Sequence, residues 1–258
     1  MDTGSGAAWE THATWWQEGF TDGADPEYTE QILPLAAAEL AARRCVLDVG
    51  CGEGQIARYL LDRAAVGGAA GVDPSQAQLD TARRRGGGPS YARAFAHRLP
   101  FAPASFDGVL ACLVFEHIEA LDEAIGEVAR VLEPGGIFLL LCNHPLLQAP
   151  GSGWIDDHIL EEQYWRVGEY LRDGMTMEEI APGVALPFVH RPMSRYLNRM
   201  AEVGLRLEWM HEPPPPPGFL ARAPEYAQAA TIPRLLALRA RRGEPVSGPA
   251  GAAGRHPS

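Results

Sequence analysis

The sequence predicts an α/β protein whose central sheet is doubly wound and mostly parallel. Apolar, strand-like runs alternate with helical segments across residues 45–142, and strict alternation of this kind is typical of a parallel sheet with helices on both faces. The strand-like run 45–49 leads directly into a glycine-rich turn, and the run 69–73 ends in an acidic residue. Both features are typical of strand ends at the ligand-binding edge of such a sheet.

The elements of this sheet are separated by recognisable turn signals. Pro74 and Ser75 favour the start of a helix, because proline and serine are frequent at helix N-termini. The segment Pro134-Gly135-Gly136 ends a helix and opens the next strand. In chain order we expect helix 29–42, strand 45–49, helix 54–64, strand 69–73, helix 75–85, strand 91–95, strand 107–113, helix 119–132 and strand 136–142.

Residues 143–188 interrupt the alternation and form an insertion with one helical piece near 160–171. A helix is expected at 192–203, because it begins at a proline and Gly204 follows it. Strands are expected at 205–210 and 231–240, joined by a stiff connector that holds five consecutive prolines. The tail beyond residue 241 is rich in glycine, proline and alanine and is expected to be disordered.

Composition narrows the possible partners. The 258 residues are 46% hydrophobic and 21% charged, as in a soluble globular protein. The apolar runs are too short for a membrane span, and the N-terminus lacks a signal-peptide pattern, so we expect a cytoplasmic protein. A net charge of −11 argues against a nucleic-acid partner. The four cysteines form no CxxC pair, so we expect free thiols and neither disulfides nor a metal site.

The turn after the first strand indicates what it binds. Asp48 is followed by Gly50, Gly52 and Gly54, and glycines let a ligand approach the backbone closely. An acidic residue here would repel a pyrophosphate, but it suits the sulfonium and amino group of S-adenosylmethionine. A nicotinamide-dinucleotide fingerprint would need a third glycine at position 55, where the chain has Gln55.

Asp73 lies at the carboxyl end of the second strand, where a carboxylate can accept hydrogen bonds from both hydroxyls of a ribose. A dinucleotide-binding fold would use the same contact, so Asp73 alone does not distinguish the two ligands. The alternative is a helix N-cap or a solvent-facing acid.

Three motifs in the same order resemble the class I S-adenosylmethionine-dependent methyltransferases. They are Val-Leu-Asp-Val-Gly-Cys-Gly-Glu-Gly at 46–54, Leu-Pro-Phe-Ala-Pro-Ala-Ser-Phe-Asp-Gly-Val at 99–109 and Val-Leu-Glu-Pro-Gly-Gly at 131–136. The resemblance covers roughly residues 43–241, and the C-terminal half is similar to bacterial small-molecule enzymes of the menaquinone and sterol type. It implies a seven-stranded sheet whose last strand is antiparallel, with S-adenosylmethionine as cofactor and S-adenosylhomocysteine as product.

The resemblance also implies which residues hold the cofactor. Family members often place an aspartate after the third strand to contact adenine, but this chain has Phe95 there. We therefore expect the adenine contact to come from Ala96 or His97. The expected cofactor-binding residues are Asp48, Gly50, Cys51, Gly52, Gly54, Asp73, Pro74, Ala96, His97 and Leu113.

Two histidines are candidates for a general base, which is needed only if the acceptor must lose a proton. His117 follows strand 107–113 and His144 follows strand 136–142, and the histidine pKa lies near working pH. Either could instead cap a helix. The expected substrate-binding residues are Trp16, Tyr28, Trp154, Tyr164, Trp165 and His190, although the aromatic ones could simply pack the insertion onto the sheet and His190 could be structural.

The sequence thus predicts methyl transfer to a small-molecule acceptor, with the attacked atom (O, N or C) and the oligomeric state left open. A binding or regulatory protein of the same fold, which holds S-adenosylmethionine or S-adenosylhomocysteine without transfer, is the alternative. The expected segments are an N-terminal helical lid at 1–42, the cofactor-binding core at 43–143, a substrate-lid insertion at 144–188, the rest of the core at 189–241 and the tail at 242–258.

Overall fold

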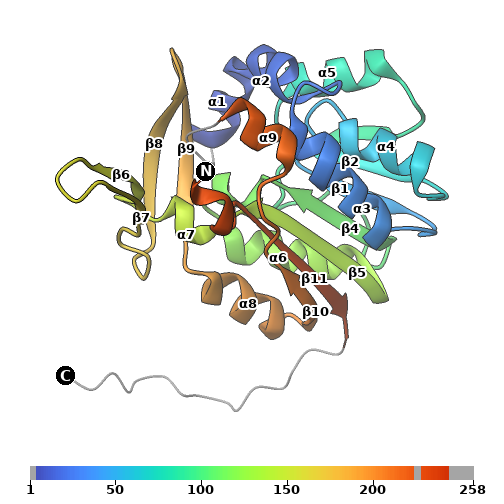
Figure 1. Cartoon of the computed structure of the whole chain (residues 1–258). Helices are drawn as coiled ribbons and strands as arrows, with labels where there is room; N and C mark the ends of the chain where they lie inside the picture. Colours follow the sequence, from blue (N-terminus) through green and yellow to red (C-terminus); the bar gives the residue numbers. More distant parts are fainter. Residues whose placement is uncertain (1–3, 224–227, 244–258) are drawn as a thin grey trace.

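A seven-stranded sheet forms the centre of the computed structural model, which describes residues 4–223 and 228–243 (Figure 1). The strand order is β10-β11-β5-β4-β1-β2-β3, and only β11 runs antiparallel to its neighbours. The doubly wound sheet and its antiparallel last strand are therefore confirmed. The strands are β1 Val46–Val49, β2 Ala69–Asp73, β3 Ser90–Arg93, β4 Phe106–Cys112, β5 Leu132–Asn143, β10 Leu205–His211 and β11 Leu235–Arg242.

Helices cover both faces of the sheet (Figure 1). Alternate residues of β1 point to opposite faces: Leu47 packs with α6 and α8, whereas Val46 packs with α3 and α4. None of the described helices is long and apolar enough to cross a membrane. The helices are α1 Gly4–Thr11, α2 Ala13–Phe20, the π-helical turn η1 Tyr28–Ile32, α3 Leu33–Glu39, α4 Gln55–Arg63, α5 Gln76–Arg85, the 3-10 turn η2 Phe115–His117, α6 Leu121–Val131, α7 Pro145–Gln148, α8 Met193–Glu202, α9 Pro217–Arg222 and the 3-10 turn η4 Gln228–Thr231.

The order of the strands opens a crevice at one edge of the sheet, between the ends of β1 and β4. β1 pairs with β2 on one side and with β4 on the other, and all three run in the same direction. The chain therefore leaves the sheet in opposite directions after β1 and β4, which opens a crevice at their carboxyl ends. The glycine turn after β1 and the turn η2 after β4 lie at this crevice.

The insertion differs from the expectation. The helical piece predicted near 160–171 is wrong, because β6 Gly153–Asp157 and β7 Glu162–Arg166 form an antiparallel hairpin there. Tyr164 and Trp165 are aromatic residues of high strand propensity, and they pair across the hairpin with Ile155 and Trp154. A second hairpin follows, made of β8 Gly174–Ala181 and β9 Val184–His190.

The strand expected at 231–240 begins later, at Leu235. Pro233 lacks the N–H that a strand inside a sheet must donate, and Gln228–Thr231 forms the turn η4 instead. The strand expected at 136–142 begins earlier, at Leu132, with an irregular register opposite β4. The tail expected to be disordered lies outside the described residues from 244 onward.

Candidate functional site

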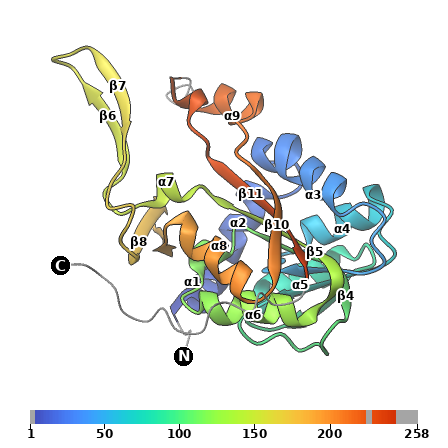
Figure 2. The ribbon, with the colours of Figure 1, turned by 90° about the horizontal axis from the view of Figure 1, so that it is seen from below.

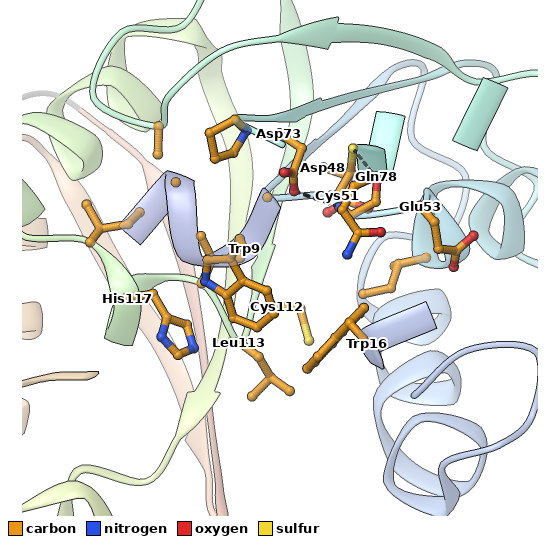
Figure 3. Close-up of a pocket in the computed structure, with 18 of the residues that line it drawn as sticks. Trp9, Trp16, Asp48, Cys51, Glu53, Asp73, Gln78, Cys112, Leu113 and His117 are labelled. Carbon is orange, nitrogen blue, oxygen red and sulfur yellow. Dashed lines mark hydrogen bonds between the residues drawn. The ribbon is translucent and has the colours of Figure 1, made fainter. Parts of the chain in front are cut away.

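A pocket opens at the carboxyl ends of β1 and β4 (Figure 3). The structure brings together residues that are far apart in the chain, from the first helix to the turn η2. Of the residues expected from the sequence, those that line this pocket are Asp48, Gly50, Cys51, Gly52, Asp73, Pro74, Ala96, His97, Leu113, Trp16, Tyr28 and His117.

The glycine turn after β1 forms the floor of the pocket. Gly50 has φ +75°, and a side chain there would collide with Val114, which follows β4. Gly54 does not line the pocket. It is the N-cap of α4 and has φ +82°, and a side chain there would collide with the hydroxyl of Tyr91. Both positions therefore favour glycine, one for the shape of the pocket and the other for packing behind it.

Asp73 holds the glycine turn in place through both of its carboxylate oxygens. Oδ2 accepts a hydrogen bond from the N–H of Gly52 at 2.9 Å, and Oδ1 accepts one from the N–H of Ser75 at 2.8 Å. Burial raises the pKa of Asp73 to about 6. Each oxygen has a further lone pair, so this carboxylate can still accept hydrogen bonds from a ligand.

Asp48 is 2% exposed, and its Oδ2 atom has no hydrogen-bond partner. Burial, followed by the neighbouring Asp73 carboxylate, raises the pKa of Asp48 to about 7. A buried carboxylate without a partner is costly. A cationic ligand in the pocket would supply the missing partner and would favour the ionised form.

The charges of the lining residues agree with a cationic ligand. Asp48, Glu53 and Asp73 line the pocket, whereas no arginine does among the described residues. Oε2 of Glu53 pairs with Arg58 and Arg85 behind the turn, while its Oε1 is buried without a partner. A phosphate would meet three carboxylates and no arginine here, so the pocket fits the sulfonium and amino group of S-adenosylmethionine better than a dinucleotide.

His97 follows β3 and also lines the pocket. Its Nδ1 atom is buried without a hydrogen-bond partner, and its ring stacks on Phe95 with centroids 5.4 Å apart. Ala96 lies between them and also lines the pocket. The loop after β3, which has Phe95 where an aspartate is frequent in the family, thus offers the unpaired Nδ1 of His97 to a ligand.

His117 is the one candidate base that the structure places in the pocket. It is 6% exposed, and its Nδ1 atom lies 2.7 Å from the carbonyl oxygen of Pro187 in β9. A carbonyl oxygen only accepts, so Nδ1 carries the proton and Nε2 keeps its lone pair. Burial lowers the pKa of His117 to about 4, which keeps the ring neutral at physiological pH.

His144 is placed elsewhere, at the start of α7. Its Nδ1 accepts a hydrogen bond from the N–H of Leu146 at 3.1 Å and so caps the helix. Its Nε2 lies 2.7 Å from Oε1 of Glu212. Both ring nitrogens are therefore engaged, and His144 does not line the pocket. This is the helix-capping role that was the alternative to catalysis.

The structure does not bring the expected residues of the insertion to the pocket. Trp154, Tyr164 and Trp165 lie on the β6–β7 hairpin, which projects away from the sheet (Figure 2). His190 ends β9, where its Nε2 lies 2.8 Å from the carbonyl oxygen of Tyr170. Of the aromatic residues expected to bind the substrate, Trp154, Tyr164 and Trp165 therefore do not line the pocket.

Trp9 lines the pocket, although the sequence did not single it out. It lies on α1, with its ring 5.0 Å from the ring of His117 and 5.3 Å from that of Trp16 (Figure 3). The aromatic residues of the N-terminal segment were the signal in the sequence, but their spacing did not indicate which of them face a ligand. In Figure 3, Trp9 lies between His117 and the carboxylates of Asp48 and Asp73.

The N-terminal segment is tied to the binding edge through α5. The hydroxyl of Ser75 donates to Glu10 at 2.7 Å, and Nε2 of Gln17 donates to Oε1 of Gln78 at 2.9 Å. Ser75 is two residues after Asp73. The contacts that hold α1 and α2 over the pocket are thus close to Asp73, which bonds to the glycine turn.

Comparisons with known proteins agree with the fold. Residues 47–140 match a family described as a methyltransferase domain. The chain is 29% identical to "O-methyltransferase resE" of Aspergillus sclerotiorum, over 76% of this chain and 80% of the relative. It is 35% identical to "Demethylmenaquinone methyltransferase" of Thermus thermophilus, over 46% of this chain and only 55% of that relative.

Among solved structures, an S-adenosylmethionine dependent methyltransferase from Mesorhizobium loti is 28% identical and has a TM-score of 0.71. The match covers 81% of this chain and 96% of that one. The fold is thus shared with a protein that is named as S-adenosylmethionine dependent. The sequence motifs, the fold and these comparisons together support a class I S-adenosylmethionine-dependent methyltransferase.

Proposed function

We propose that this methyltransferase acts on a small, neutral and partly apolar molecule, and that His117 is its general base. The observation that carries the proposal is the state of His117: a neutral imidazole whose protonated Nδ1 is held by Pro187 and whose Nε2 is free to accept a proton. The relative named an O-methyltransferase supports an oxygen atom as the acceptor.

The donor half of the pocket would be formed by the residues around β1 and β2. Asp73 would accept the ribose hydroxyls, Asp48 would face a cationic group, and Ala96 or His97 would contact the adenine. When bound, S-adenosylmethionine supplies an electrophilic methyl group on its sulfonium. The turn 50–54 leaves the backbone open to this ligand because Gly50 and Gly52 carry no side chains.

The acceptor half would be formed by Trp9, Leu113, Val114, His117 and Ile118, all of which line the pocket. These side chains are apolar except for the imidazole. A carboxylate or phosphate acceptor would have no arginine among the lining residues to neutralise it. A phenol or enol fits better, because it enters uncharged and loses its proton only as the methyl group is transferred.

His117 would take that proton on Nε2. Its low pKa means that it is a weak base in the empty pocket, but negative charge that develops on the acceptor oxygen stabilises the imidazolium beside it. The indole of Trp9 and the buried position of His117 exclude water from this step. The main contribution of the protein would remain the placement of the acceptor atom next to the methyl group.

The N-terminal segment would act as the lid. Trp9 and Trp16 line the pocket, and Glu10 and Gln17 bond to α5, so α1 and α2 would order over the bound donor. The insertion would contribute through β9, whose Pro187 contacts His117, and not through the aromatic residues of the β6–β7 hairpin. A cytoplasmic location stays a prediction.

The proposal can be tested with isotope-labelled S-adenosylmethionine and matched acceptors. A panel would hold the same aromatic ring with a hydroxyl, a carboxylate or an amino group. We expect label on the phenol and little on the carboxylate. Label on the carboxylate alone would contradict the acceptor class, while label on none with intact S-adenosylhomocysteine binding would contradict transfer to this kind of ring.

A further inference from the structure

The chain bends sharply between α2 and the π-helical turn η1. Asp22 and Gly23 both have a left-handed backbone, with φ +56° and +84°, and the N–H of Ala24 bonds to the carbonyl oxygen of Thr21 at 3.0 Å. Glycine, and aspartate to a lesser degree, adopt this conformation more readily than other residues. The bend separates α1 and α2, which we call the lid, from the rest of the chain, and we call residues 21–24 the base of the lid.

One guanidinium group joins the base of the lid to the glycine turn of the pocket. It belongs to Arg85, the last residue of α5. Its Nη1 donates to Oγ1 of Thr21 at 3.1 Å and also pairs with Oε2 of Glu53. Its Nη2 lies 2.8 Å from Oδ2 of Asp22. A planar guanidinium holds its acceptors in a fixed geometry, so the three acceptors are fixed relative to one another.

The two segments that Arg85 joins both reach the pocket, although Arg85 itself does not line it. Thr21 is 2% exposed and Glu53 is 1% exposed, and both are lining residues. In Figure 3 the carboxylate of Glu53 is directed away from Trp9, toward the side on which Arg85 meets it. The junction therefore lies beside the space for a ligand, where it can act on both walls of the pocket without contacting the ligand.

Two neighbouring contacts show why Arg85 has a special place at this junction. Arg58 on α4 also pairs with Oε2 of Glu53, but no hydrogen bond joins Arg58 to the lid or its base among the described residues. Nε2 of Gln55 donates to the carbonyl oxygen of Phe20 at 3.3 Å, which is a long bond between neutral groups. Charge-assisted hydrogen bonds are stronger than neutral ones, so Arg85 should contribute most to holding the lid against the turn.

We propose that Arg85 is a positioning residue that couples closure of the lid to binding of the methyl donor. By holding the base of the lid against Glu53, it makes the ligand-binding shape of the glycine turn and the closed position of the lid favour each other. Such coupling is reciprocal: if the closed lid strengthens donor binding, the bound donor stabilises the closed lid by the same factor. The proposal rests on the lid that is part of the proposed function, but it does not depend on the identity of the acceptor.

Two measurements on the full chain test the coupling, and neither involves turnover. Calorimetry gives the Kd of S-adenosylhomocysteine, and hydrogen exchange of the α2 amides, residues 13–20, reports how often the lid opens. In Arg85→Met we expect the Kd to rise about tenfold and the α2 amides of the free protein to exchange about tenfold faster. Saturating S-adenosylhomocysteine should protect these amides less in the variant than in the wild type.

Two other arginines provide matched comparisons. Arg58→Met breaks the second ion pair of Glu53 and leaves the base of the lid intact, so it should weaken binding without changing exchange in α2. Arg83→Met removes a half-exposed pair with Asp80 on the same helix as Arg85, and it should change neither quantity. If Arg85→Met behaved like Arg58→Met, Arg85 would act on the turn alone and the proposal would be wrong.

Thr21→Val removes the contact on the lid side and keeps the ion pair between Arg85 and Glu53. We expect the same two changes as in Arg85→Met, with a rise in Kd of about threefold. The double variant should bind about as weakly as Arg85→Met alone, because both changes break the same link. Effects that multiply in the double variant would overturn the proposal, as would faster exchange in α2 with an unchanged Kd.

Circular dichroism shows whether each variant is folded. If Arg85→Met does not fold, Thr21→Val decides the question by the same two measurements, because it leaves the buried carboxylate of Glu53 paired. Neither measurement uses an acceptor molecule. A failure of the acceptor panel would therefore leave this proposal standing, and a failure here would leave the acceptor class standing.

Discussion

Nδ1 of His117 lies 2.7 Å from the carbonyl oxygen of Pro187, and this contact joins the core of the fold to its insertion. The histidine follows β4, whereas the proline lies seventy residues later in β9. The carbonyl fixes the tautomer of the ring, because it can only accept a hydrogen bond. The insertion therefore determines which nitrogen of the histidine is free.

The role of His117 can be measured by its replacement. His117→Ala should lower kcat about 10²–10⁴-fold, because the acceptor then has no base in the pocket. The affinity for S-adenosylhomocysteine, measured by calorimetry, should stay the same. The corresponding change at the helix-capping histidine, His144→Ala, should affect thermal stability more than kcat. If His117→Ala transferred methyl groups at the wild-type rate, placement alone would account for catalysis.

Asp73 should dominate donor affinity. Asp73→Ala removes the proposed acceptor of two ribose hydroxyls and releases the N–H groups of Gly52 and Ser75. We expect S-adenosylhomocysteine to bind about 10–100-fold more weakly, as measured by calorimetry. Asp80→Ala, an exposed acid on α5, is the control. Unchanged affinity in Asp73→Ala would contradict the assignment of the ribose site.

Donor affinity should rise with pH between about 5 and 8. The raised pKa values of Asp73, about 6, and Asp48, about 7, mean that both carboxyls hold protons in the lower part of this range. A ligand that binds the ionised forms must displace those protons, so its affinity increases as pH passes through the two pKa values and then levels off. In Asp48→Asn the upper part of this rise should disappear. A pH-independent Kd for the wild type would show that the donor does not depend on these charges.

Trp9 should be required for closure of the pocket. In Trp9→Ala we expect weaker donor binding and a lower kcat, because water can reach the reacting atoms. Trp15→Ala is a close control, since Trp15 packs on Trp16 and Phe20 in α2 but does not line the pocket. Equal behaviour of the two variants would mean that the N-terminal segment acts only through its overall stability.

Arg191 should act on catalysis through the position of His117. It is 5% exposed and donates to the carbonyl oxygens of Ile118 at 2.6 Å and Glu119 at 2.9 Å, directly after the turn η2. Arg191→Met should lower kcat more than it raises KM, and Arg191→Lys should restore part of the loss.

A readout independent of turnover is the ¹⁵N NMR signal of the His117 ring, in which the Nδ1–H tautomer should become less dominant in Arg191→Met. Arg195→Met is the control, because Arg195 is half exposed and pairs with Asp122 and Asp173 instead. An unchanged tautomer and an unchanged kcat would show that Arg191 is not needed to position the histidine.

The part of the pocket around β1 and β2 could be predicted from the sequence because its residues lie at strand ends. Asp48, the glycines after it and Asp73 each lie at the end of an apolar run, and parallel strands bring such ends to one edge of the sheet. Strand periodicity and turn residues are properties of short segments, so the order of strands and helices from 45 to 142 followed from them. The hairpin at 153–166 did not, because its aromatic residues fit either a helix or a strand until their partners are known.

The choice between His117 and His144 depended on contacts across long stretches of the chain. Both follow a strand of the sheet, and nothing in the neighbouring residues separates them. Pro187 leaves one nitrogen of His117 free inside the pocket, whereas Leu146 and Glu212 occupy both nitrogens of His144 outside it. Trp9 reached the pocket in the same way, through the bonds of its helix to α5. Hydrogen bonds between distant segments produce no periodic pattern in the sequence, because they form only when folding brings the two segments together.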